Sequence, residues 1–147
     1  MRIEETAFPI GRWAFPALVV LWLATLFATP FTDGDQFILA TQAGVFLQAA
    51  AVVAALLQRW PLRRVVAAAV TLAALTWAVE AIGAATGFPF GDYSYTNALQ
   101  PQLVGVPLLI PVAWLMMLAP SWAVAELLVG SSEAPSVVER LKFAAVA

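Results

Sequence analysis

The sequence predicts an all-α fold, a polytopic transmembrane helix bundle, and two observations lead to this prediction. Of the 147 residues, 63% are hydrophobic and only 11% are charged. A soluble domain is typically about 45–50% apolar and about 25% charged. In addition, four runs approach or exceed the ~20 mostly apolar residues that a helix needs to cross a bilayer. A water-soluble surface cannot be made from this composition, so we expect an integral membrane protein.

The first three spans are predicted at about 13–29, 37–57 and 65–87. Pro16 falls in the opening turn of the first span, where proline is tolerated. The second span is entirely uncharged, and Glu80 is the only charge in the third.

The fourth span is predicted at about 105–129 and carries three prolines. Pro107 suits a helix start, whereas Pro111 and Pro120 should kink the helix unless neighbouring helices satisfy the freed carbonyls. Glu126 lies near the end of this span, where a carboxylate can reach headgroups and water, so we expect an interfacial role for it.

The basic residues predict the orientation, because cytoplasmic loops carry the excess of Lys and Arg. In the four-span arrangement all seven basic residues lie on one side, namely Arg2, Arg12, Arg59, Arg63, Arg64, Arg140 and Lys142. The charged residues in the loops on the other side are all acidic, namely Asp33, Asp35 and Asp92. We therefore expect a protein of the cell membrane whose N-terminus and Arg59–Arg64 loop are cytoplasmic.

Residues 131–147 are predicted to begin with a cytoplasmic linker, after which an apolar pattern resumes at Val137. Two interpretations remain open for this second part. It is either a short amphipathic interfacial helix or the truncated start of a fifth span.

The composition narrows the available chemistry. The chain has no Cys and no His, so thiolate ligands and the commonest metal ligand are missing, and we expect neither a metal nor a cofactor. Seven basic against nine acidic residues give no basic surface for nucleic acid. Any reaction must therefore use carboxylates, hydroxyls, amides and aromatic rings.

Glu80 is the strongest candidate for such chemistry. It lies roughly 22 Å along the third span, inside the hydrocarbon layer. A carboxylate at the centre of a membrane helix costs about 2.5–3.5 kcal/mol on insertion scales, which makes a function the first hypothesis. The structural alternative is a Glu hydrogen-bonded to another helix, for example through Gln42, Gln48 or Thr76.

An aromatic loop that folds back between the third and fourth spans is predicted directly after Glu80. Gly87 fits a helix C-terminus, Pro89 and Gly91 specify a turn, and Gly83 with Gly87 matches the small-residue spacing of packed helices. Four rings and one acid share this segment, namely Phe88, Phe90, Asp92, Tyr93 and Tyr95, while Trp77 lies one turn before Glu80 and Trp114 lies in the fourth span. Together they could form a pocket that opens to lipid.

The 35 positions from Glu80 to Trp114, including Gly83, Gly87, Pro89, Gly91, Pro107 and Pro111, resemble the signature of the carotenoid biosynthesis protein family. Members of this family are usually longer, so the resemblance implies that the chain is the N-terminal part of a larger fold. It also implies a cofactor-independent hydratase, which adds water to the C1–C2 double bond of an acyclic carotenoid end group through a tertiary cation.

In that reaction Glu80 would donate the proton, and Asp92, Tyr93 or Tyr95 would orient the water. The aromatic rings of Trp77, Phe88, Phe90 and Trp114 would hold the end group and stabilise its cation. The carotenoid would enter from the lipid phase, membrane lipids would surround the protein, and a homo-oligomer is compatible with the sequence.

Three other functions remain open. A small proton-coupled transporter would account for Glu80 but not for the aromatic loop, and we find no internal repeat of the kind transporters show. A carotenoid end-group cyclase would share the protonation step. An assembly subunit without chemistry is the remaining alternative.

Overall fold

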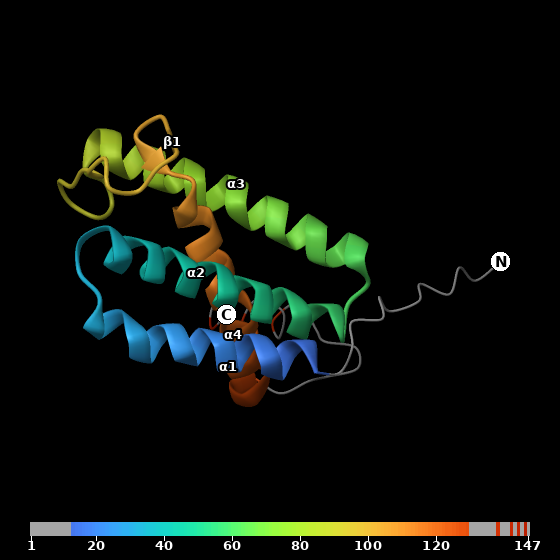
Figure 1. Cartoon of the computed structure of the whole chain (residues 1–147). Coiled ribbons are helices and arrows are strands. Elements are labelled where there is room, and N and C mark those ends of the chain that lie inside the picture. The colour runs from blue at the N-terminus through green and yellow to red at the C-terminus, as the bar shows by residue number, and fades with distance from the viewer. Residues whose placement is uncertain (1–12, 130–137, 139–141, 143, 145, 147) are drawn as a thin grey trace.

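The computed structural model describes residues 13–129 together with 138, 142, 144 and 146. In chain order its elements are α1 (Ala14–Ala28), a 3₁₀ turn (Thr29–Phe31), α2 (Gly34–Leu57), α3 (Leu62–Thr86), β1 (Gln102–Leu103), β2 (Val106–Pro107) and α4 (Leu109–Val129) (Figure 1).

The predicted membrane bundle is confirmed. Within the described part of the chain, four helices are long and apolar enough to cross a membrane, and they correspond to the four predicted spans. Helices α2 and α3 each begin three residues before the predicted bounds, at Gly34 and Leu62. The early start of α3 places Arg63 and Arg64 in its first turn, because a helix can extend beyond the hydrocarbon layer into the polar interface.

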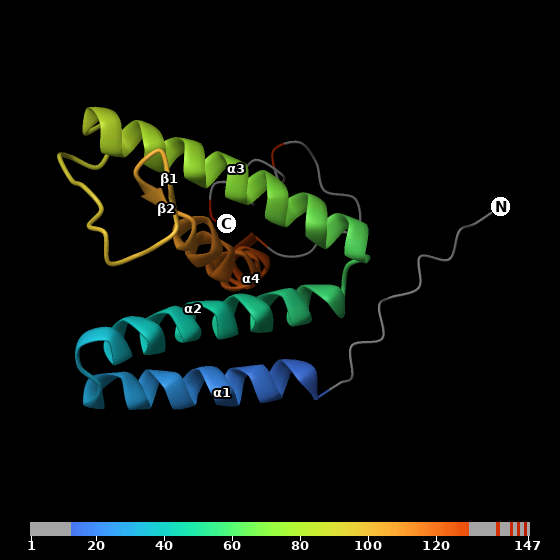
Figure 2. The same ribbon diagram turned by 45° about the horizontal axis from the view of Figure 1, so that its top comes forward.

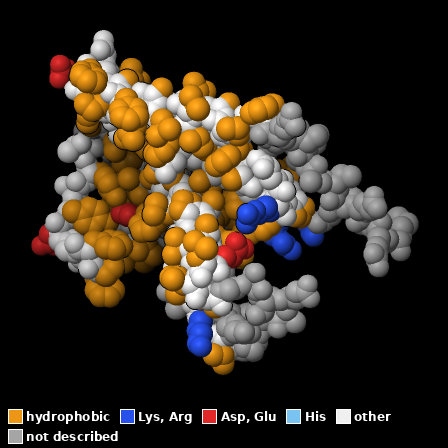
Figure 3. Space-filling model, turned by 90° about the horizontal axis from the view of Figure 1, so that it is seen from below, with side chains coloured by type: hydrophobic (Ala, Val, Ile, Leu, Met, Phe, Trp, Pro, Cys, Tyr) orange, Lys and Arg blue, Asp and Glu red, His pale blue; other side chains and the backbone are white. Residues whose placement is uncertain are grey.

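The helices pack in the order α1, α2, α4, α3. Helices α1 and α2 form an antiparallel pair, and α4 crosses between α2 and α3 (Figure 2). The small buried core lies near the α2–α3 connection and contains Val52, Leu56, Leu57 and Val65, against which Trp60 and Leu118 pack. Hydrophobic side chains cover most of the described surface in Figure 3, as expected for helices that face lipid.

The prediction for the start of the fourth span is wrong. Residues 105–108 are not helical; a β-hairpin pairs Gln102 with Pro107 and Leu103 with Val106 before α4 begins at Leu109. Val104 and Gly105 form its turn with φ of 53° and 76°, which is the two-residue geometry that lets strands reverse tightly. Pro107 is therefore a buried strand residue and not a helix start.

The two remaining prolines of the fourth span lie within α4. Pro111 is in the first turn, where backbone N–H groups have no helical partner, so its missing N–H breaks no helical hydrogen bond and the expected kink is not required there. Pro120 lies inside the helix. The predicted linker and further helix at 131–147 fall outside the described residues, apart from four single positions.

Glu126 lies at the end of the bundle that carries the α2–α3 connection. Its Oε2 is 3.5 Å from Nη1 of Arg59, and its Oε1 accepts a hydrogen bond of 2.9 Å from the Trp122 indole. The side chains of Arg59 and Glu126 are 72% and 38% exposed, so this is a surface ion pair that contributes at most about 1 kcal/mol to stability.

Candidate active site

Glu80 lies near the end of α3 that is remote from the basic connection, six residues before Thr86. It is the one charged side chain among the described residues that is buried, with 8% of its surface exposed. Its carboxyl group is held by two phenols and one indole. The Tyr93 and Tyr95 hydroxyls donate hydrogen bonds of 2.9 and 2.7 Å to Oε2, and the Trp114 indole N–H donates one of 3.3 Å to Oε1.

The loop after α3 carries both tyrosines back over the helix. Gly87 ends α3 with φ of 76°, a left-handed conformation that glycine adopts without a steric cost, and Gly91 turns the chain again with φ of 87°. The Tyr93 ring then packs edge-on against both Phe90 and Tyr95. This return fixes the positions of the two phenols relative to Glu80.

Gly83 makes room for this loop. A Cβ atom at position 83 would lie 2.6 Å from the Tyr93 hydroxyl oxygen, closer than real side chains approach, and a tight 3.1 Å from Phe90 Cδ2. Gly83 was expected both to allow close contact between helices and to shape the loop, and in the structure the loop aromatics occupy its surface. The absence of a side chain lets Tyr93 reach both the carboxyl and the backbone oxygen of Glu80.

The hairpin positions α4 and is tied to α3. The Trp77 indole donates a hydrogen bond of 3.3 Å to the Leu103 carbonyl, and the Gln102 amide donates to the carbonyls of Thr96 and Leu99. Gln102 was not singled out from the sequence, although its place between Pro101 and a short Val-Gly turn is a signal for a structured loop. These contacts connect the hairpin to α3 and to the loop that carries the tyrosines.

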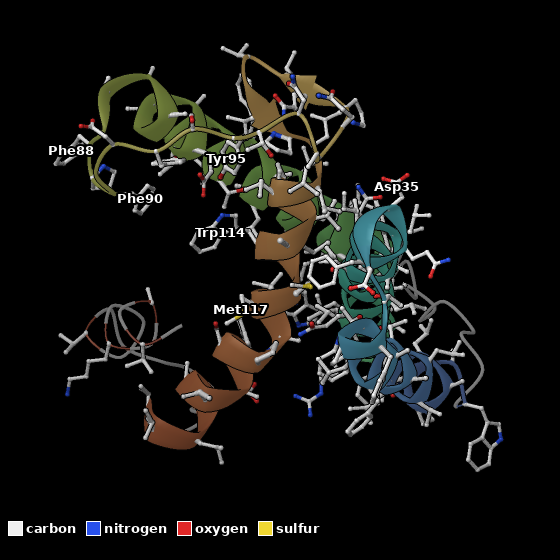
Figure 4. The ribbon with its side chains drawn as sticks, turned by 60° about the vertical axis from the view of Figure 1, so that its left-hand side comes forward. Asp35, Phe88, Phe90, Tyr95, Trp114 and Met117 are labelled. Carbon is white, nitrogen blue, oxygen red and sulfur yellow. The ribbon has the colours of Figure 1, made fainter. Side chains whose placement is uncertain are left out.

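The other predicted site residues lie at different distances from the acid. Figure 4 shows Tyr95 and Trp114 approaching the same region from the loop and from α4, with Phe90 beside it and Phe88 at the outer tip of the loop. Phe88 is 74% exposed, and the exposed Asp92 has its Oδ1 beside Gly87. The side chain of Asp92 has no hydrogen-bonding partner among the described residues, so the structure brings the tyrosines to Glu80 but not Asp92.

The partners of Glu80 differ from those of the structural alternative. Thr76 donates its hydroxyl to the carbonyls of Leu72 and Ala73 within its own helix. In the described part of the chain, Gln42 and Gln48 make no hydrogen bond with Glu80. The carboxyl group is therefore held by aromatic donors and not by the amides of α2.

The donor set distinguishes the two carboxyl oxygens. An indole N–H can only donate, so Oε1 must accept from Trp114. A phenol can donate or accept, so the contacts at Oε2 can persist whether the carboxyl carries a proton or not. Oε2 is therefore the oxygen at which a proton can be held and exchanged. The described residues contain no group of three carboxylates that could hold a metal ion.

Burial raises the pKa of the Tyr93 and Tyr95 phenols above the usual value, and the hydrogen bonds with Glu80 and its negative charge raise the pKa of both further. Both hydroxyls therefore stay protonated at physiological pH. The folded state binds these two protons more tightly than the unfolded state does, so the raised pKa values stabilise the fold. This stabilisation is present below the ordinary phenol pKa of about 10 and is lost as the pH rises through the raised pKa values.

A spectroscopic titration tests this arrangement, because the chain has only two tyrosines and both lie in the site. We expect tyrosinate absorbance of the folded protein to appear clearly above pH ~10, the ordinary value. In Glu80→Gln the midpoint should fall towards that value, since the negative charge is removed. A titration of the unsubstituted protein with an ordinary midpoint, unchanged in Glu80→Gln, would contradict the contacts described.

Comparison with known proteins supports the family resemblance. The family model for carotenoid biosynthesis proteins matches residues 41–147, almost three quarters of the chain. The chain belongs to the carotenoid biosynthesis protein family. The match contains α3, the aromatic loop, the hairpin and α4, so the three residues that donate hydrogen bonds to the Glu80 carboxyl group lie within the part shared with the family.

This member of the carotenoid biosynthesis family is also similar to a curated protein. Over 80 residues, 54% of its length, it is 32% identical to bisanhydrobacterioruberin hydratase from Haloarcula japonica. The matched residues span 27% of the length of that hydratase. No solved structure matches the chain.

Proposed function

We propose that this member of the carotenoid biosynthesis family is a hydratase that adds water to the C1–C2 double bond of an acyclic carotenoid end group. The observation that carries the proposal is the buried Glu80 carboxyl group, which two phenols and an indole N–H hold inside a membrane helix. The name of the similar haloarchaeal hydratase agrees with this reaction.

The proposed reaction starts from the protonated state of Glu80, with the proton on Oε2, and not from the carboxylate. Transfer of this proton to C2 breaks the alkene π bond and leaves a tertiary cation at C1 and a carboxylate at Glu80. Positioned general acids of this kind contribute typically about 10²–10⁴-fold to the rate. The indole N–H of Trp114 and the two phenols are already oriented towards the carboxylate that this step creates.

The second step forms the alcohol. Water attacks C1, and the proton that it loses returns to Glu80, so that the sum is alkene plus water giving a tertiary alcohol with no net change in the enzyme. Tyr93 and Tyr95 are the hydroxyl groups beside Oε2 and are proposed to orient this water and pass on its proton. Asp92 is less well placed than the tyrosines to orient the water, because its carboxylate lies beside Gly87 in the exposed part of the loop.

The aromatic rings are proposed to stabilise the cation. Phe90, which packs against Tyr93, is 54% exposed, and Trp114, which donates to Glu80, is 42% exposed, so their faces are accessible to a substrate that arrives from the lipid phase. A desolvated cation over an aromatic face gains about 2 kcal/mol. Trp77, by contrast, uses its indole N–H to hold the hairpin, so we propose that it positions the site.

Expression in cells that accumulate lycopene tests this function. The proposal predicts a product heavier by one water, detected by chromatography with mass spectrometry. A product of unchanged mass but altered retention would instead indicate a cyclase, since cyclisation is an isomerisation. If lycopene and γ-carotene both remain unchanged in cells that contain the folded protein, the hydratase proposal for this chain is wrong.

A further inference from the structure

A groove with a volume of about 580 Å³ lies between α3 and α4, on the side of Glu80 that faces the α2–α3 connection. Small side chains of α3 form its floor, and larger apolar side chains of both helices form its walls. The floor contains Ala67, Ala68 and Thr71, and the walls include Leu72, Leu118 and Trp122.

Two rows of side chains connect this groove with the acid. On α3, Leu72, Thr76 and Glu80 follow one another at intervals of four residues, so they lie along one ridge of the helix. On α4, Trp122, Leu118 and Trp114 form the matching ridge. Leu72 and Leu118 meet at the groove, and Glu80 and Trp114 meet at the acid site.

The α3 ridge between Leu72 and Glu80 presents no free hydrogen-bond donor. Thr76 is the polar residue on the α3 ridge between Leu72 and Glu80, and its hydroxyl donates a hydrogen bond of 2.8 Å to the Leu72 carbonyl. That proton is therefore already used within the helix. A hydrocarbon chain can lie along this route without leaving the Thr76 donor unsatisfied.

Trp60 and Arg64 line the end of the groove that is remote from Glu80. The Arg64 guanidinium lies 5.9 Å from the centroid of the Trp60 ring, which in turn packs edge-on against Trp122 at 5.0 Å. From Arg64 to Glu80 is 16 residues of one helix, or about 24 Å at a rise of ~1.5 Å per residue. The groove and the acid site together therefore extend along about 24 Å of α3.

We propose that this groove binds the polyene chain of the carotenoid whose end group reaches Glu80. The groove and the acid site lie on the same pair of helices about two helical turns apart, the residues that line the groove are mostly apolar, and an extended conjugated chain is a rigid apolar rod. The identity of the end group at Glu80 rests on the proposed function, whereas binding of the polyene in the groove can be measured without any reaction.

Filling the floor of the groove tests the proposal. The probe is lycopene, and the readout is the pigment retained per protein after purification in detergent, measured in a Glu80→Gln background so that turnover does not remove the ligand. Ala68→Phe should lower retention about tenfold, since misfit in an apolar pocket costs at least that much. The matched control is Ala74→Phe, at an exposed position of the same helix that does not line the groove, and it should retain pigment like its parent.

The outcomes separate the groove from the reaction. Equal retention in Ala68→Phe and Ala74→Phe would overturn the groove proposal, and loss of a co-purified phospholipid from Ala68→Phe alone would then assign the groove to an acyl chain. Selective pigment loss in Ala68→Phe would support the groove even if the unsubstituted protein hydrates nothing. Should Ala68→Phe fail to fold, Thr71→Leu fills the same floor with a smaller change.

Discussion

Replacing Glu80 with glutamine should lower hydration of the carotenoid end group by at least about 10²-fold, the lower end of what a positioned general acid contributes. Glutamine has nearly the same shape, and its carbonyl oxygen can still accept from the Trp114 indole. What it lacks is a proton that it can give to a carbon atom. The loss should therefore appear in product formation and not in folding, which product chromatography and thermal unfolding in detergent measure separately.

Glu126→Gln is the matched control, because it makes the same chemical change at the other acidic residue of the predicted spans. Glu126 is partly exposed and paired with Arg59 at the opposite end of the bundle. Its replacement should change the hydration rate by no more than about twofold, since a surface ion pair contributes at most about 1 kcal/mol to stability. Comparable activity of Glu80→Gln and the unsubstituted protein would remove Glu80 as the acid.

Gly83→Ala should reduce hydration about 10²-fold, although it adds only one methyl group. Alanine favours a helix interior over glycine by about 1 kcal/mol, so α3 itself should become more stable. The new Cβ, however, would lie 2.6 Å from the Tyr93 hydroxyl oxygen, so the tyrosine must move away from Glu80. A displacement of about 1 Å in a catalytic arrangement can cost about 10²-fold in rate.

Gly44→Ala is the control for this substitution. Gly44 also lies inside a membrane helix, and its Cβ would meet Thr25 Oγ1 at 3.2 Å, far from the acid in the chain and in the fold. We expect hydration to be retained in Gly44→Ala. If Gly83→Ala hydrates lycopene as well as Gly44→Ala does, the contact between Tyr93 and Glu80 is not needed for the reaction.

The helices could be predicted from the sequence because lipid imposes a simple rule. Long runs with at most one charge cross the membrane as helices, so the four spans followed from the positions of these runs, and the basic residues on one side supported the number of spans. The start of α4 could not be found this way. The hairpin at 102–107 is held by a two-residue turn, by the Gln102 amide and by the Trp77 indole, and none of these contacts changes the hydropathy of the segment.

The acid site was predictable as a group of residue types but not as a set of contacts. A charged residue inside a span and a loop rich in Gly, Pro and aromatic residues indicated Glu80, Tyr93 and Tyr95 together. That Trp114 binds the other carboxyl oxygen depends on how α4 crosses α3, which is a matter of packing between residues 34 positions apart. The role of Gly83 likewise becomes visible only when the loop is in place.

The most direct test of the account follows isotopes from water into the product. Membranes that contain the protein are supplied with lycopene in deuterated water and, separately, in water enriched in heavy oxygen. The account predicts one deuterium bound to carbon at C2 and a hydroxyl oxygen at C1 that comes from water, both lost in Glu80→Gln. A hydroxylated product without deuterium on carbon, or with oxygen from O₂, would contradict protonation of the alkene by Glu80.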